Sequence, residues 1–153
     1  MAKRLCLFDQ TRDFFALVSA DGRLRVWDVS TGALLRQYVE KNHLEQSYTC
    51  ISWGRPRSSG SLGLIALGTS KGYIVVWDLS RGKVIQKLGG SGVGHGSNVN
   101  DVAFDASGAI LFSCSDEKKI LQWDVQVSFC SHWTPPGFFV LKCDILSFVL
   151  LYM

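Results

Sequence analysis

Residues 64–87 read LIALGTSKGYIVVWDLSRGKVIQK, which is three short apolar runs separated by two polar turns. The first run ends at Thr69, and the second ends in Trp77-Asp78. The intervening turns, Ser-Lys-Gly and Ser-Arg-Gly, both contain glycine. Apolar runs of this length bounded by Gly and Ser are typical of antiparallel strands joined by tight turns. The stretch therefore predicts a small antiparallel sheet.

The same pattern occurs twice more in the chain, as FFALVSADGRLRVWD at residues 14–28 and ILFSCSDEKKILQWD at residues 110–124. Each copy ends in Trp-Asp, and the tryptophans Trp27, Trp77 and Trp123 are separated by 50 and then 46 residues. A lone four-stranded sheet exposes apolar surface on both faces and buries too little of it to offset the entropy of ordering its backbone. We therefore expect the repeated units to stack face to face.

Composition sets limits on the class of protein. The 153 residues are 47% hydrophobic and 19% charged, the balance of one packed globular domain. A net charge of +3 does not by itself indicate nucleic-acid or membrane binding. The odd number of cysteines, with no CxxC pair, indicates neither a disulfide framework nor a zinc site and favours a reducing compartment. They are Cys6, Cys50, Cys114, Cys130 and Cys143.

We expect one repeat domain over residues 1–127, with units at 5–38, 43–88 and 95–127. The third unit lacks a clear fourth strand, because no glycine turn follows Gln126. Residues 128–153 form a divergent tail, for which we expect an improvised strand or a disordered, sticky segment. Its apolar part, 138–153, contains Lys142 and Asp144 and is shorter than the ~20 residues that cross a bilayer, so no membrane anchor is predicted.

Three further features have a functional and an ordinary interpretation. Arg55 and Arg57 flank a proline and could form a basic contact loop for an acidic partner or phosphate backbone, or simply a solvated loop. The glycine run at 89–96 lacks the lysine of a phosphate-binding loop and is better interpreted as a connector. Cys130 and His132 would supply only half of a metal site.

The three in-register Trp-Asp pairs, with Gly94-His95 ahead of the last unit, resemble the WD40-repeat family. The resemblance implies an all-β fold, a partial WD40 β-propeller of about three four-stranded antiparallel blades. The third blade would be incomplete and followed by the apolar C-terminal tail.

In that family a histidine, a strand serine or threonine, a turn aspartate and the tryptophan form a hydrogen-bonded network within each blade. The resemblance places His95, Ser115, Glu117 and Trp123 in this network in the third unit. The second unit offers His43, Thr69 and Trp77, with Lys71 at the acidic position. The first offers Ser19, Asp21 and Trp27, with no histidine.

His95, Ser115 and Asp116 could also be interpreted as a nucleophilic triad. The sequence has no nucleophile elbow to support that interpretation. We therefore predict no enzymatic activity, and no catalytic residue, cofactor, metal or small-molecule substrate.

Longer strings, among them residues 15–27, 64–69 and 113–126, resemble the opening blades of the WD-repeat protein 43 family. That resemblance implies a nuclear, nucleolar scaffold for ribosome biogenesis. Its partners would be proteins of a large ribonucleoprotein assembly, the small-subunit processome, with pre-rRNA contacted indirectly. One alternative is an adaptor in another complex, such as a ubiquitin-ligase substrate receptor. Those receptors often carry Trp-Asp-x-Arg, whereas Ser30, Ser80 and Gln126 stand at that position here. Another alternative is a non-functional truncated product.

Overall fold

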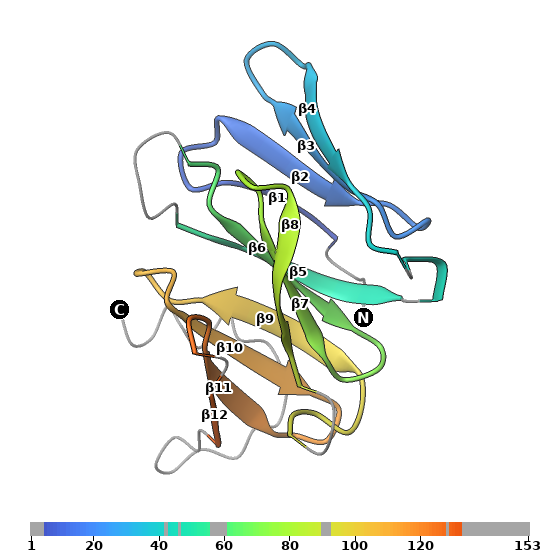
Figure 1. Ribbon diagram of the computed structural model, residues 1–153, viewed down its shortest axis with the longest axis vertical. Helices are drawn as coiled ribbons and strands as arrows, with labels where there is room; N and C mark the ends of the chain where they lie inside the picture. Colours follow the sequence, from blue (N-terminus) through green and yellow to red (C-terminus); the bar gives the residue numbers. More distant parts are fainter. Residues whose placement is uncertain are drawn as a thin grey trace.

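The computed structural model describes residues 5–41, 43–45, 47–55, 61–89, 93–127 and 129–132. These residues form three four-stranded antiparallel sheets and one short 3-10 helix, η1 (His43–Glu45) (Figure 1). The first sheet contains β1 (Cys6–Phe8), β2 (Phe14–Val18), β3 (Leu24–Asp28) and β4 (Leu34–Tyr38). The second contains β5 (Tyr48–Gly54), β6 (Leu64–Thr69), β7 (Ile74–Asp78) and β8 (Lys83–Leu88). The third contains β9 (Val99–Phe104), β10 (Ile110–Ser115), β11 (Ile120–Asp124) and β12 (Phe129–His132).

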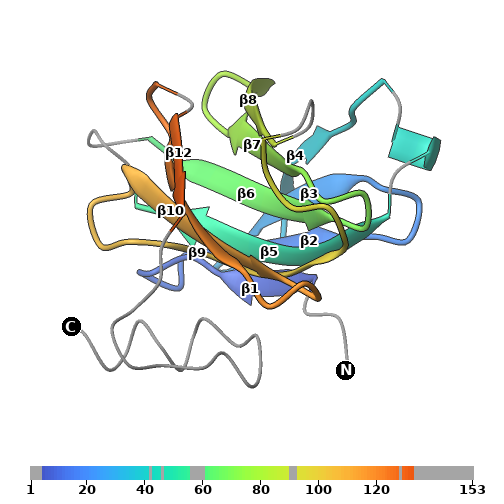
Figure 2. The same ribbon diagram turned by 90° about the horizontal axis from the view of Figure 1, so that it is seen from below.

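Each sheet keeps its strands in chain order, and the first strands of the three sheets lie next to one another. Strand β5 lies between β1 and β9, whereas β4, β8 and β12 form the opposite edges of their sheets (Figures 1 and 2). This fan of stacked meanders is the arrangement of successive propeller blades.

Two apolar clusters fill the spaces between the sheets. In the first cluster, Val18 and Val26 of the first sheet pack with Ile65, Leu67 and Trp77 of the second. Because side chains alternate along a strand, the other face of the second sheet is also apolar and forms the second cluster with the third sheet. The second sheet is therefore buried on both faces, as its nearly continuous apolar runs predict.

The second and third sheets pack closely together at Gly68. A Cβ atom at this position would overlap the Cys50 side chain and come within 2.8 Å of Val99 Cγ1. Across the same junction, Thr49 Oγ1 donates to the Val99 carbonyl at 2.5 Å. Strand β6 therefore needs glycine here, because Cys50 of β5 and Val99 of β9 together occupy the space of a side chain.

The third sheet has a fourth strand, where the sequence predicted no clear one and left an improvised strand or a disordered segment as alternatives. Strand β12 pairs with β11 from Asp124↔Phe129 to Leu121↔His132. In the turn before β12, Asp124 Oδ1 accepts from the backbone N–H groups of Gln126 and Val127 at 2.8 and 3.3 Å. Asp28 and Asp78 accept from backbone N–H groups in the equivalent turns of the other two sheets. Strand pairing uses backbone groups and does not require the repeat pattern of side chains.

The structure does not test the remaining predicted unit boundaries. The described residues contain no helix long and apolar enough to span a membrane.

Candidate functional site

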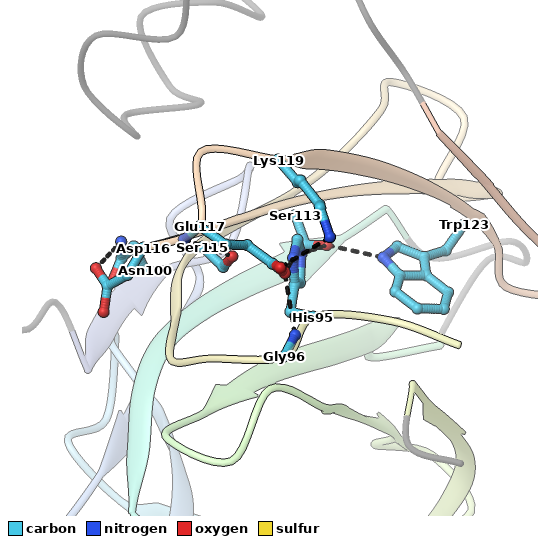
Figure 3. Close-up of polar contacts among 9 residues, drawn as sticks. All are labelled: His95, Gly96, Asn100, Ser113, Ser115, Asp116, Glu117, Lys119 and Trp123. Carbon is cyan, nitrogen blue, oxygen red and sulfur yellow. Dashed lines mark hydrogen bonds and ion pairs between the residues drawn. The ribbon is translucent and has the colours of Figure 1, made fainter. Parts of the chain in front are cut away.

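A buried hydrogen-bonded chain joins the tryptophan of the third sheet to the loop that precedes the sheet (Figure 3). Trp123 Nε1 donates to Ser113 Oγ at 2.8 Å. Ser113 Oγ lies 2.8 Å from His95 Nε2, and His95 Nδ1 lies 3.2 Å from Glu117 Oε1. All but Glu117 are buried, with relative exposure of 6% or less. The chain therefore ties three separate segments together: the loop before β9, strand β10 and strand β11.

The carboxylate of Glu117 ends this chain near the surface. Glu117 Oε1 accepts from the Gly96 backbone N–H at 3.0 Å, and Glu117 Oε2 lies 2.9 Å from Lys119 Nζ. Its own backbone N–H donates to Ser115 Oγ at 3.3 Å. The interaction with Lys119, followed by those with Gly96, His95 and Ser115, lowers the pKa of Glu117 to about 2. Glu117 therefore connects the turn after β10 to the loop before β9.

The serine that bridges histidine and tryptophan is Ser113, whereas the sequence predicted Ser115. Ser113 pairs with Leu121 and shares its face of the sheet with Trp123, two residues further along β11. Ser115 follows a register shift at the end of β10 and contacts the turn at Glu117. One signal for Ser113 is present in the sequence: the other two units have leucine there, Leu17 and Leu67.

The second sheet has no equivalent chain within its described residues. Trp77 Nε1 is buried and has no hydrogen-bond partner among the residues that the structure describes, and Leu67 stands where Ser113 would be. Thr69 instead closes its own turn, with Oγ1 donating to the Tyr73 carbonyl at 2.8 Å. The side chain of the predicted His43 lies outside the described residues, and its role stays a prediction.

In the first sheet an arginine connects the residues that the sequence singled out. Ser19 Oγ donates to Asp21 Oδ1 at 2.5 Å, and Arg25 Nη1 donates to Ser19 Oγ at 2.7 Å. Arg25 Nη2 also lies 3.7 Å from Asp21 Oδ2. Trp27 packs against the ring of Phe15, with centroids 5.9 Å apart. Arg25 was not singled out from the sequence. One signal was present: the second unit has the apolar Val75 at the equivalent position.

The predicted alternative of a nucleophilic triad does not match the geometry. Asp116 accepts a hydrogen bond from Asn100 Nδ2 at 2.7 Å, and the carboxylate beside His95 is that of Glu117 (Figure 3). Burial is the largest influence on His95 and lowers its pKa, so the imidazole is neutral near pH 7. The hydroxyl beside His95 belongs to Ser113, which has no exposed surface. The arrangement acts as a structural tie.

The other predicted sites remain untested. Arg55 is exposed, and Arg57 lies outside the described residues, so the basic contact loop stays a prediction. Strand β12 contains Cys130 and His132, whose side chains are likewise outside the described set. Within the described ranges, no group of three or more His, Cys, Asp or Glu residues is arranged to hold a metal ion.

Acidification is expected to weaken this network. The pKa of Glu117, about 2, lies below its ordinary 4.5, so its contribution to stability is present above about pH 4.5 and is lost as the pH falls toward 2. The pKa of His95 is also lowered, so below about pH 6.5 the unfolded chain takes up a proton that the folded chain resists. Both shifts reduce stability at low pH.

Melting temperatures measured between about pH 7 and pH 3 test this expectation. They should fall less steeply for Glu117→Gln than for the unmodified chain. Parallel profiles of the two proteins would contradict the prediction.

Comparison with known proteins gives matches of three kinds. The family described as "WD domain, G-beta repeat" matches residues 82–124. Human WD repeat-containing protein 43 is 34% identical over 140 residues, covering 79% of this chain and 20% of the relative. WD repeat and SOCS box-containing protein 1 of Takifugu rubripes is 30% identical over 106 residues, covering 69% of this chain and 22% of the relative. The chain thus spans about a fifth of the length of these relatives.

A solved structure, described as the crystal structure of the mitotic checkpoint complex, contains a chain with the same fold. It superposes with a TM-score of 0.67 at 21% identity, over 86% of this chain and 37% of that one. This likeness concerns the fold alone, and it confirms the expected partial propeller.

Proposed function

Because the chain belongs to the WD40-repeat family, we propose that it is a non-enzymatic interaction scaffold that works in ribosome biogenesis. Its place would be the small-subunit processome of the nucleolus, in pre-rRNA transcription and 18S rRNA maturation. The observation that carries this proposal is the 34% identity to human WD repeat-containing protein 43, which extends over 79% of the chain. The aligned share of the chain is larger than the stretch 82–124 that the family model matches.

The geometry of the third blade supports a scaffold. Its polar groups are directed toward one another, and His95 and Ser113 are buried rather than presented to a substrate. Strand-connecting loops, which a rigid stack holds in fixed relative positions, offer a surface for recognition. Protein partners, and pre-rRNA through them, fit such a surface better than a small molecule does.

The test is to express the tagged chain in human cells and to follow both its location and its sedimentation. We expect nucleolar signal and co-sedimentation with pre-ribosomal particles that contain pre-rRNA and processome proteins. A companion variant, Arg55→Ala combined with Arg57→Ala, removes the two charges of the predicted basic loop and leaves the buried network unchanged. If this variant no longer associates with the particles, the basic loop makes the contact to them.

Recovery with ubiquitin-ligase subunits, away from pre-ribosomal particles, would overturn the proposal and favour the adaptor alternative. Rapid degradation of the chain, with no stable complex, would favour a non-functional truncated product.

A further inference from the structure

Strand β4 is the outer edge of the first sheet (Figure 1). Among the described strands, only β3 pairs with β4, so alternate backbone N–H and C=O groups of β4 point away from the sheet and can pair with a further strand. Its exposed residues include Leu34 (50%) and Leu35 (42%), and Val39, just beyond its end, is 42% exposed. The equivalent strand β8 exposes only Lys83 and Lys87, and lysine on an edge strand discourages pairing. Strand β4 is therefore the more open of these two edges.

Exposed cations lie along the side of β4 that is directed toward the second sheet. Arg36 is exposed, makes no ion pair with the described residues, and shares this side of the strand with Tyr38. The turn between β7 and β8 lies against the same side, because Tyr38 Oη donates to the Leu79 carbonyl at 2.6 Å. Two more exposed cations follow Leu79 in the chain, Arg81 in this turn and Lys83 at the start of β8.

The carboxylates of this region are far less exposed than the cations that they pair with. Asp78 Oδ2 lies 3.3 Å from Arg81 Nη1, and the two side chains are 14% and 70% exposed. Glu40, which follows β4, pairs with Lys87, and these side chains are 10% and 50% exposed. Each pair therefore presents its cation to the surface, and the surroundings of β4 are complementary to an acidic partner.

We propose that β4 binds an extended acidic segment of another protein, which joins the first sheet as a fifth strand. Backbone pairing along β4 supplies the hydrogen bonds, apolar side chains of the segment pack on Leu34 and Leu35, and its carboxylates lie near Arg36. A second copy of this chain fits less well. Full antiparallel pairing of two β4 strands would bring their central residues, both Arg36, next to each other, and like charges repel. The inference goes beyond the proposed scaffold role and does not depend on the nucleolar assignment.

Nuclear magnetic resonance titration of the isotopically labelled full chain tests this proposal. The probe is a short capped peptide of alternating valine and glutamate. We expect chemical-shift changes and slower amide hydrogen exchange centred on β4, with none along β8. Arg36→Glu should weaken binding at least about tenfold, because attraction becomes repulsion, and a peptide of alternating valine and lysine should bind this variant instead. The matched control, Lys71→Glu, makes the same charge change in the exposed turn between β6 and β7 and should leave the affinity unchanged.

Two further measurements keep the result interpretable. The melting temperature of Arg36→Glu should equal that of the unmodified chain, because the exposed guanidinium has no ion-pair partner among the described residues. A valine–glutamate peptide that is methylated at its backbone nitrogens should not bind, because it cannot donate to a strand.

Four results would overturn the proposal. The first is a titration in which the acidic peptide causes no change at β4, and the second is an equal change along β8. The third is unaltered binding of the methylated peptide, which would show that strand pairing is not involved. The fourth is binding of a single-stranded RNA oligonucleotide through Arg36 without binding of the acidic peptide, which would assign the edge to nucleic acid.

Discussion

Replacing Trp77 or Trp123 with alanine is expected to lower the free energy of unfolding by about 3–5 kcal/mol, whereas Trp27→Ala should cost only about 1 kcal/mol. The three tryptophans occupy equivalent positions in their units, but they differ in what lies opposite. Trp77 and Trp123 are 5% and 1% exposed and face a neighbouring sheet. Trp27 is only partly buried, on the outer face of the first sheet. Truncation of Trp77 or Trp123 therefore leaves a buried cavity, whereas truncation of Trp27 removes a side chain from a partly exposed surface.

Urea or guanidinium unfolding followed by far-ultraviolet circular dichroism measures these differences. Trp27→Ala serves as the matched control, since it deletes the same side chain from the same strand position. Equal losses at all three sites would contradict the stacking of the sheets, because then no tryptophan would be distinguished by its neighbour.

Ser113→Ala should destabilise the third blade by about 2–4 kcal/mol, although it removes a single oxygen atom. The change leaves Trp123 Nε1 and His95 Nε2 buried without their shared partner. An unpaired buried polar group costs about 1–3 kcal/mol, so the loss of two partners exceeds the value of an average hydrogen bond.

A comparison of two Trp→Phe changes separates this hydrogen bond from the loss of ring area. Trp77→Phe removes a donor that has no partner among the described residues, whereas Trp123→Phe removes the donor to Ser113. Trp123→Phe should therefore cost more than Trp77→Phe in the unmodified chain, and the difference should shrink in the Ser113→Ala background. A difference that persists without Ser113 would show that the bridge does not stabilise the blade.

Much of the fold could be predicted from residue patterns. The alternation of Leu24 and Val26, the apolar run 64–69 and the glycine turns predict strands and meanders, because these signals come from neighbouring residues. The repeat then predicts stacking. In the third unit, His95 lies 3.2 Å from Glu117, and Ser113 connects His95 to Trp123; the blade network expected for the three units stays a prediction.

The roles that the sequence did not predict are set by strand register and by contacts between turns and strands. Ser113 and Ser115 are two residues apart, so alternation alone favours neither, and the register of β10 against β11 decides. Arg25 contacts Ser19 and Asp21 through its guanidinium group, a contact that no repeated residue indicates, since the second unit has Val75 at this position. Strand β12 lacks the side-chain pattern of the other fourth strands, so the sequence predicted it only as one of two alternatives, and backbone pairing adds it to the sheet.

The central claim is that the tryptophan-ended sheets are successive blades whose faces meet. Nuclear Overhauser spectroscopy tests it most directly at Tyr38 and Trp77, whose ring centroids are 5.5 Å apart although they belong to different sheets. The account predicts cross-peaks between the ring protons of Tyr38 and those of the Trp77 indole. An assigned spectrum in which Trp77 contacts only protons of its own sheet would contradict it.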